Sequence, residues 1–397
     1  MKDLKHLIYF ESLLENANNE LIQKAQADGQ ICLGYTCFHI PEVLLNVDNC
    51  FSTRLRAPNT GSIDIATYYM SNYTCEYARA LLERAIEGGY QYLDALIGVD
   101  ACSMMNRSME HFEILNVNDK PNFFVTHCDM PFKIEDYTIE SYVKQMRVHV
   151  LSELTRRFGT DTSDEAIRKA VEEHNEMCRI ITEIGEMRKA ANPVVTGYEF
   201  HLINLVSYVC PTALILPYLR ETLEELKTRE PDAKSAFRAR VAIVGSEIDD
   251  PNLTKLIEGC GALVVSDRYC FGSKPGREEI ILNDEEDVLW QICRHYMEVS
   301  ECARYISDEK VHQRRETSDH LAKEFGAEGI IYEQMKYCDY WGFERALVSH
   351  IMHDEYGWPV LSIDRLYNNG NSGQLRTRVQ AFVESLEIKR IHKEEGK

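Results

Sequence analysis

Short apolar runs alternate with amphipathic stretches along the first part of the chain. Four stretches have the length and apolar character of strands: residues 30–36, 50–56, 92–99 and 122–126. Three neighbouring stretches repeat apolar residues at helical spacing: residues 7–26, 65–70 and 75–87. Strands that alternate with amphipathic helices are typical of a parallel sheet covered by helices. We therefore expect residues 1–133 to form an N-terminal α/β domain.

The same alternation returns after a long helical stretch. Helical periodicity runs through residues 143–157, 164–187 and 198–227. Residues 134–236 are therefore expected to form a helical connection. Four more strands are predicted, at residues 239–244, 262–265, 329–335 and 358–363. With the helices after them, they predict a second α/β domain over residues 237–397. The predicted fold class is α/β, with two doubly wound, Rossmann- or flavodoxin-like domains, parallel sheets and a long helical segment joining them.

The composition of the 397-residue chain limits the classes of function that it can have. A formal net charge of −20 disfavours a surface for nucleic acid or for an anionic membrane. No run approaches the roughly 18 apolar residues of a membrane span, so we expect a cytoplasmic protein. The thirteen cysteines are then expected to be reduced, because that compartment disfavours disulfides. Metal ligation, redox chemistry and simple burial remain as their roles.

Several cysteines follow predicted strands directly. Five lie just beyond strand ends: Cys37, Cys102, Cys128, Cys270 and Cys338. Cys75 joins them from the start of a predicted helix. Because the carboxyl ends of parallel strands share one edge of a sheet, where open α/β folds bind ligands, we expect these six thiols at such edges. The sequence contains neither a CxxC pair that would suit zinc nor the CxxCxxC run of ferredoxins.

Two interpretations of these thiols stay open at this level. In the first, they hold an iron–sulfur cluster that folding gathers from separate strand ends, and a helix N-terminus favours the thiolate of Cys75. In the second, each thiol is a small buried apolar side chain. We expect that second role for the other seven: Cys32, Cys50, Cys178, Cys210, Cys260, Cys293 and Cys302.

Four stretches of the chain, taken in order, form a specific combination. They are residues 34–42, residues 75–79 with 100–102, residues 245–251 through 267–272, and residues 337–339 with 373–382. This combination resembles the 2-hydroxyacyl-CoA dehydratase and benzoyl-CoA reductase family, including the D-component of 2-hydroxyglutaryl-CoA dehydratase. The resemblance implies an oxygen-sensitive protein in which Cys75, Cys102 and Cys338 hold a 4Fe–4S cluster with one open iron. It also implies three partners: an acyl-CoA substrate, an ATP-hydrolysing iron–sulfur activator, and a homologous second subunit or second copy.

By this resemblance we expect the iron–sulfur subunit of an (R)-2-hydroxyacyl-CoA dehydratase. Such an enzyme removes water from a 2-hydroxyacyl thioester through a ketyl radical, which makes the C3 proton acidic. Three alternatives remain: a benzoyl-CoA reductase-type subunit, a non-catalytic partner subunit, and a double-cubane reductase of a small molecule. A related branch of the superfamily holds two bridged cubanes, and that interpretation would add Cys37, Cys128 and Cys270 to the ligands.

For other polar residues the sequence supports only weaker hypotheses about ligand binding and proton transfer, and no residue is assigned a catalytic role. Five cations are candidates for the phosphates of coenzyme A or are ordinary surface cations: Arg54, Arg56, Lys274, Arg376 and Arg378. Ser372 and Gly373 open a predicted helix whose N-terminus suits an anion, although simple capping explains them equally well. Four residues beside the rim cysteines are proton-carrier candidates by proximity alone, with turn roles preferred: His39, Glu42, His127 and Asp129.

Overall fold

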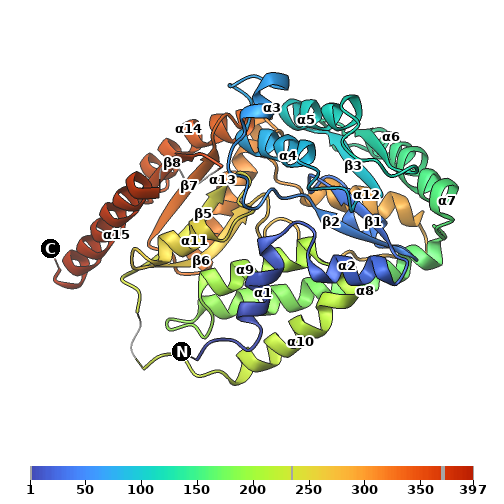
Figure 1. Ribbon diagram of the computed structural model, residues 1–397. Coiled ribbons are helices and arrows are strands. Elements are labelled where there is room, and N and C mark those ends of the chain that lie inside the picture. Colours follow the sequence, from blue (N-terminus) through green and yellow to red (C-terminus); the bar gives the residue numbers. More distant parts are fainter. Residues whose placement is uncertain (1, 234–235, 368–371, 397) are drawn as a thin grey trace.

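Two four-stranded parallel sheets form the framework of the computed structural model, which describes residues 2–233, 236–367 and 372–396 (Figure 1). The first sheet contains β1 (Ile31–Tyr35), β2 (Cys50–Arg54), β3 (Ala95–Asp100) and β4 (Phe124–Asp129). The second contains β5 (Ala239–Gly245), β6 (Ala262–Tyr269), β7 (Gly329–Met335) and β8 (Val360–Arg365). Neighbouring strands in both sheets pair in parallel. The predicted fold class is confirmed, whereas the boundaries at residues 133 and 236 stay predictions. The outer ends of the predicted domains, residues 1 and 397, lie outside the described residues.

Short helices accompany the first sheet. They are α1 (Leu7–Glu15), α2 (Glu20–Ala27), the 3₁₀ turn η1 (Glu42–Leu45), α3 (Asp64–Tyr69), α4 (Glu76–Ile86) and α5 (Ser103–Ile114). The stretch predicted as one helix over residues 7–26 is two helices, because Asn19 starts the second. Its side chain accepts hydrogen bonds from the backbone N–H groups of Leu21 and Ile22. Helix α5 directly follows β3 and was not among the predicted helices.

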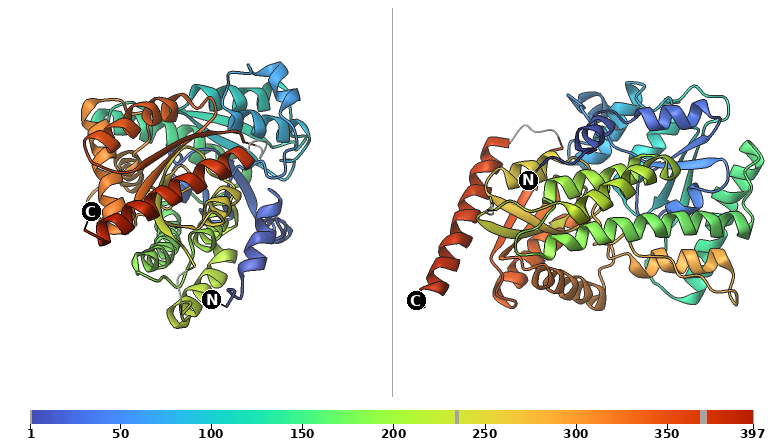
Figure 2. Two further views of the ribbon diagram at one scale, coloured as in Figure 1. Left: turned by 90° about the vertical axis from the view of Figure 1, so that its left-hand side faces the viewer. Right: turned by 90° about the horizontal axis from the view of Figure 1, so that it is seen from below.

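The helical connection between the two halves packs on both faces of the first sheet. Its elements are α6 (Asp136–Gln145), the π-helical η2 (Met146–Leu151), α7 (Ser152–Phe158), α8 (Asp164–Glu186), η3 (Met187–Lys189), α9 (Gly197–Val209) and α10 (Thr212–Thr228). Elements α6 and η2 lie on one face of that sheet and α9 lies on the other. The long helices α8 and α10 run side by side, as the view from below shows (Figure 2). Helix α9 is buried along nearly its whole length and contacts both β2 and β6, so it bridges the two sheets.

The remaining helices belong to the second half of the chain. They are α11 (Asn252–Glu258), α12 (Val288–Val299), α13 (Asp308–Glu324), α14 (Asp339–Asp354) and α15 (Ser372–Glu394). Helix α13 begins after Ser307, whose side chain accepts a hydrogen bond from the backbone N–H of Lys310. Cys302 therefore lies in the loop between α12 and α13 and outside any helix.

In both sheets the order in which strands are added reverses at a corresponding place. The strand orders are β2-β1-β3-β4 and β6-β5-β7-β8, so the chain leaves β1, and later β5, first to one side and then to the other. Such switch points, at the carboxyl ends of the strands, are where open α/β sheets bind ligands. In this protein Cys37 follows β1 and Cys102 follows β3, while Glu247 follows β5 and Cys338 follows β7.

One apolar core joins the two halves of the molecule. Leu81 of α4, Leu205 of α9, Ile243 of β5 and Val383 of α15 belong to a single cluster of buried side chains. The two sheets are therefore held in a fixed relation to each other. Within the described ranges, no helix combines the length and the apolar character that crossing a membrane requires.

Candidate functional site

Three helix N-termini converge where the carboxyl ends of the two sheets face each other. Cys75 is the N-cap of α4, Cys102 is the N-cap of α5, and Cys338 is the N-cap of α14. Figure 1 shows the two halves meeting where α4, α5 and α14 begin. A backbone hydrogen bond also joins the halves here, since the N–H of Glu76 donates to the carbonyl of Lys336 at 3.3 Å.

The three thiols lie close enough to influence one another. Burial raises the pKa of Cys75 to about 12, and the nearby thiol of Cys102 also raises it. Burial raises the pKa of Cys338 well above its usual range, and both Cys75 and Cys102 raise it further. Hydrogen bonds from backbone N–H groups of the first helical turns lower the pKa of all three thiols. These donors stabilise thiolates, as helix N-termini generally do.

A second group of thiols adjoins the first. Cys37, Cys270 and Cys302 line one small, largely apolar cavity of about 40 Å³. After burial, the largest influence on the raised pKa of Cys37 is the thiol of Cys302, which also raises the pKa of Cys270. The groups are continuous, because Cys102 raises the pKa of Cys302 and Cys338 raises that of Cys270. Folding thus gathers six cysteines from both halves of the chain.

Cys128 takes a different position. Its side chain is fully buried in the apolar core of the first half, together with Tyr142 and Cys293. Burial raises the pKa of Cys128 to about 12, and the charge of Asp129 makes a smaller contribution in the same direction. The cavity beside Cys37 and Cys270 is lined by Cys302, where the sequence led us to expect Cys128.

An arginine and a glutamate lie among the six thiols. Arg54 is 1% exposed, donates to the carbonyl of Cys270 at 2.6 Å, and lies 3.5 Å from a carboxylate oxygen of Glu247. Burial raises the pKa of Glu247 to about 7, while Arg54 lowers it. The carboxylate in turn raises the pKa of Cys37, Cys75 and Cys270. Arg54 Nε and Glu247 Oε2 are buried without a hydrogen-bond partner, which marks polar groups that a ligand here would contact.

The four proton-carrier candidates have structural partners or lie elsewhere. His39 is buried, with one ring nitrogen 2.7 Å from Ser300 Oγ and the other 3.4 Å from Cys37 Sγ. Glu42 is buried between Arg277, His174 and Tyr35. His127 and Asp129 both belong to β4, and Asp129 is exposed. None of the four is assigned proton transfer.

Most of the candidate cations are engaged within the chain. Lys274 Nζ lies 3.8 Å from Glu278, and Arg378 donates to the carbonyl of Ser362 at 2.5 Å. Arg376, Ser372 and Gly373 are exposed on α15. Ser372 and Arg378 nevertheless line one cavity of about 270 Å³, together with Lys336, Arg365, Asp250 and Asp364.

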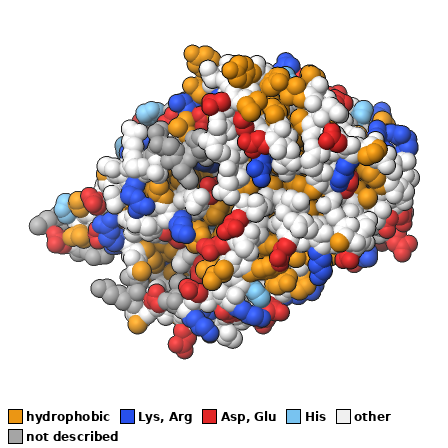
Figure 3. All heavy atoms as spheres, viewed as in Figure 1, with side chains coloured by type: hydrophobic (Ala, Val, Ile, Leu, Met, Phe, Trp, Pro, Cys, Tyr) orange, Lys and Arg blue, Asp and Glu red, His pale blue; other side chains and the backbone are white. Residues whose placement is uncertain are grey.

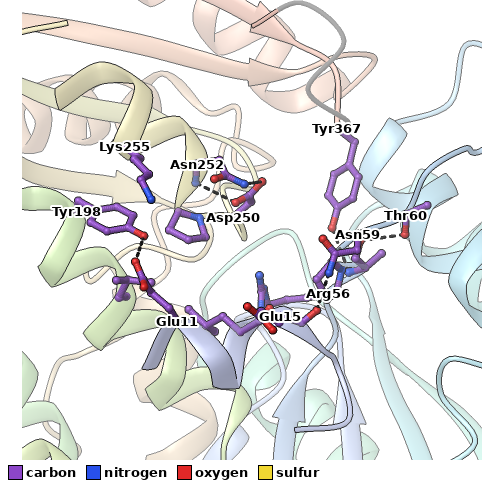
Figure 4. A pocket seen from close by; sticks show the side chains of 15 residues that line it. Glu11, Glu15, Arg56, Asn59, Thr60, Tyr198, Asp250, Asn252, Lys255 and Tyr367 are labelled. Atoms are coloured by element: carbon purple, nitrogen blue, oxygen red, sulfur yellow. Dashed lines mark hydrogen bonds between the residues drawn. The ribbon is translucent and has the colours of Figure 1, made fainter. Parts of the chain in front are cut away.

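Arg56 lines a separate cavity of about 420 Å³ between α1, α9 and the loops after β2 and β5 (Figure 4). Its guanidinium donates to the backbone carbonyls of Asp249 at 2.5 Å and Leu14 at 3.1 Å, and is therefore committed to holding the halves together. The other charged side chains around this cavity are mixed in sign: Glu11, Glu15, Asp250 and Lys255. This lining lacks the strongly basic character that suits the phosphates of coenzyme A.

The donor set suits an iron–sulfur cluster better than a single ion. Thiolates are the usual ligands of such clusters, and a cubane spreads them over different irons. In the part of the chain that the structure describes, no three His, Cys, Asp or Glu side chains could hold one metal ion together. The candidate site thus offers the three thiols at helix N-termini, the three adjoining thiols and two unpartnered polar atoms as possible ligands.

Comparison with known proteins places the chain in a family. Residues 37–386 match the family described as 2-hydroxyglutaryl-CoA dehydratase, D-component. The chain belongs to this family. The match includes the N-terminal Cys37 and the distal Cys338, so the whole candidate site lies within it. The family resemblance inferred from the sequence is confirmed.

Relatives in the D-component family cover most of the chain at low identity. The (R)-phenyllactyl-CoA dehydratase beta subunit of Clostridium sporogenes is 22% identical over 95% of this chain and 97% of its own length. The beta subunit of (R)-2-hydroxyglutaryl-CoA dehydratase from Acidaminococcus fermentans is 21% identical, over 92% and 95%. A benzoyl-CoA reductase subunit from Thauera aromatica is 20% identical over 81% of each chain. All three are subunits of larger enzymes.

Two residues of the candidate site escaped the sequence analysis. Cys302 was expected to be a small buried apolar side chain, although the polar residues Ser300 and Glu301 beside it are a local sign of a loop. Glu247 lies within a stretch that carries the D-component resemblance, but an acidic residue after a strand has no distinctive signal by itself. Only the fold shows that both face the strand-end cysteines.

Proposed function

We propose that this chain is the iron–sulfur subunit of a 2-hydroxyacyl-CoA dehydratase-type enzyme. The observation that carries the proposal is the convergence of three helix N-termini, each with a cysteine at its N-cap position, between two sheets. Cys75, Cys102 and Cys338 would hold a 4Fe–4S cluster, which leaves one iron without a protein thiolate. A cluster of this kind supplies low-potential electrons and a Lewis-acidic iron.

The protein residues prepare this site in three ways. The N–H groups at the starts of α4, α5 and α14 favour the ionised thiols. Burial under side chains from both halves limits access of water, and the thirteen free cysteines suit the reducing cytoplasm that we propose. Arg54 offers a buried positive charge beside the thiolates. Together these features stabilise an anionic inorganic group in the interior.

The relatives support the remaining parts of the proposal. Each is one subunit of a larger enzyme, which favours a homologous second subunit or a second copy beside this chain. We propose an acyl-CoA thioester as substrate, with removal of water from its 2-hydroxyacyl group through a ketyl radical. We also propose an ATP-dependent iron–sulfur activator as electron donor. The substrate would lie largely on the second subunit, because the candidate phosphate-binding cations of this chain are engaged or dispersed.

A second candidate function is favoured by one specific observation. Cys37, Cys270 and Cys302 line a cavity that adjoins the first three thiols. Six cysteines are what a double-cubane cluster requires, and its reductases act on small molecules in place of acyl-CoA. Under this candidate, Cys302 replaces Cys128 in the set that the sequence suggested.

Iron and sulfide content separates the two candidates. The protein is purified anaerobically and reconstituted with iron and sulfide, without the activator. We expect about four irons per chain for one cubane and about eight for a double cubane, and Cys102→Ala to lose most of the iron in either case. Protein that binds no iron and sulfide would contradict the proposed function.

Two cysteine variants then test the ligand set. Cys302→Ala should lower the iron content only if the cluster is a double cubane. Cys128→Ala is the control, because Cys128 is a fully buried thiol of the apolar core that does not line the cavity of Cys302. Iron lost from Cys128→Ala and kept in Cys302→Ala would return Cys128 to the ligand set.

A further inference from the structure

The cavity of about 420 Å³ that Arg56 lines is separate from the candidate iron–sulfur site. None of the described cysteines lines it, and its walls come from α1, α9, α11 and the loops after β2, β5 and β8. Its volume is in the range of small-molecule sites in proteins. Figure 3 shows carboxylates and basic side chains intermingled on the face where α1 and α11 lie. The charges around this cavity therefore decide what it can hold.

Arg56 places a buried positive charge in the wall of the cavity. The residue is 4% exposed, and its guanidinium donates to the carbonyl oxygens of Asp249 and Leu14, which carry no charge. The carboxylate of Asp249 accepts a hydrogen bond from the hydroxyl of Tyr367 at 2.6 Å instead. No carboxylate of the described residues forms an ion pair with Arg56. Because buried charges are normally paired, this wall suits a ligand with a negative group.

Three carboxylates also line the cavity, and two of them are already engaged. Glu11 accepts a hydrogen bond from the hydroxyl of Tyr198 at 2.6 Å, and Asp250 accepts one from the backbone N–H of Asn252 at 2.8 Å. Glu15 is exposed, and its carboxylate has no hydrogen-bond or ion-pair partner within the described part of the chain. This carboxylate is therefore available to a positive group of a ligand.

The balance of charges selects the kind of ligand. Arg56 and Lys255 are the two cations of the lining, and the three carboxylates give it a net charge of −1. A simple anion would be repelled by the carboxylates, and a simple cation would leave Arg56 unpaired. Figure 4 shows Glu11 and Glu15 between Lys255 and Arg56, so opposite charges alternate around the space. A zwitterion satisfies both signs.

We propose that this cavity binds a free α-amino acid with a large apolar side chain. The carboxylate of the ligand accepts hydrogen bonds from Arg56, which has five N–H donors and a planar shape that matches a carboxylate. The ammonium group of the ligand binds Glu15. The side chain of the ligand packs on Leu14, Leu202 and Pro58, which supply apolar surface to the cavity. This binding site goes beyond the proposed iron–sulfur function and does not depend on it.

Isothermal titration calorimetry of the full-length protein, as purified, tests the proposal with or without bound iron. The probes are L-methionine and L-tryptophan, two amino acids whose apolar side chains differ in size. Two blocked forms of the first probe separate its charges, since N-acetyl-L-methionine lacks the ammonium group and L-methioninamide lacks the carboxylate. We expect each blocked form to bind at least about tenfold more weakly than L-methionine, because each leaves one charged group without its partner.

A substitution at the rim tests the ammonium contact. Glu15→Gln should weaken the binding of L-methionine about two- to fivefold, because Glu15 is exposed, and should leave the binding of N-acetyl-L-methionine unchanged. Glu140→Gln is the matched control, since Glu140 is exposed on α6 and does not line the cavity. This control should match the wild type with both compounds.

A substitution in the wall tests the carboxylate contact. Arg56→Lys should weaken the binding of L-methionine about tenfold and leave that of L-methioninamide unchanged. Circular dichroism shows whether this variant folds, and if it does not, the blocked forms and Glu15→Gln decide. No binding of either amino acid to the wild type, or equal binding of L-methionine and its blocked forms, would overturn the proposal. Either result would leave the iron content, and with it the proposed function, unaffected.

Discussion

Arg277 and Glu42 form a buried ion pair behind the candidate site. Their nearest atoms are 3.1 Å apart, the arginine side chain is fully buried, and it also donates to Ser207 Oγ at 2.7 Å. Glu42 follows Cys37 on the first sheet's edge, whereas Arg277 follows Cys270. The pair therefore fixes two loops that each carry a candidate ligand, and it does so without touching the cavity itself.

We expect Glu42→Ala to lower the free energy of unfolding by about 3–5 kcal/mol, because it leaves the buried charge of Arg277 unpaired. Urea unfolding of the apo protein measures this. Glu298→Ala is the control, since its partner Arg294 is on the surface, and we expect a loss of about 1 kcal/mol or less. Equal losses for both variants would show that burial does not govern the strength of these pairs.

The same pair predicts part of the response to acid. Although burial raises the pKa of Glu42, His174 and Arg277 lower it to about 2. A carboxyl whose pKa is lower in the folded protein adds stability above its unfolded pKa, near 4.5, and loses it as the pH falls towards 2. Unfolding free energies from about pH 5 to about pH 2 should decline less steeply for Glu42→Gln than for the wild type. Parallel declines would contradict this assignment.

At the scale of elements, β5 and β7 pair closely at the carboxyl edge, where Gly245 lies opposite Glu333. A Cβ atom added to Gly245 would lie 2.6 Å from the backbone carbonyl oxygen of Glu333 and 2.7 Å from its carboxylate. That carboxylate accepts hydrogen bonds from the backbone and the hydroxyl of Ser246. The glycine thus lets two strands meet at the switch point just before Glu247.

We expect Gly245→Ala to destabilise the protein by about 1–3 kcal/mol, because backbone atoms must separate to admit the methyl group. Gly373→Ala, in the exposed first turn of α15, should be neutral or slightly stabilising, since no atom lies within 4 Å of the added Cβ. Thermal unfolding of the two variants makes the comparison. An unchanged melting temperature for Gly245→Ala would show that β5 can shift away from β7.

Strand positions and the parallel sheets could be predicted because buried parallel strands read as continuous apolar runs. Cys75, Cys102 and Cys338 could be placed at sheet edges by the same logic. The position of Cys302 could not, because its loop is fixed by distant contacts. Arg314 donates to the carbonyl of Cys302 at 3.3 Å, and Arg304 donates to Met130 and Pro131 near the end of β4. Those long-range bonds leave no periodic trace in the sequence.

At the scale of the whole molecule, one apolar core is shared by the two sheets, and α9 contacts both of them. We therefore expect the halves to unfold together despite the length of the chain. Trp341 and Trp358 pack beside the second sheet, whereas Trp290 on α12 packs against the core of the first, so the fluorescence of a Trp290→Phe variant reports the second half alone. Its denaturation curve should coincide with the curve from far-ultraviolet circular dichroism. A fluorescence midpoint at a different urea concentration would indicate separate unfolding units.

Drawing ligands from both halves also has a consequence for biosynthesis. More than 230 residues separate Cys102 from Cys338, so the ribosome finishes the first thiols well before the last. At about 5–20 residues per second, this interval lasts roughly ten to fifty seconds. During that time Cys75 and Cys102 have no partner from β7. Under the proposed function, iron delivery must then follow translation, and the nascent chain depends on the cell to keep its early cysteines from oxidation.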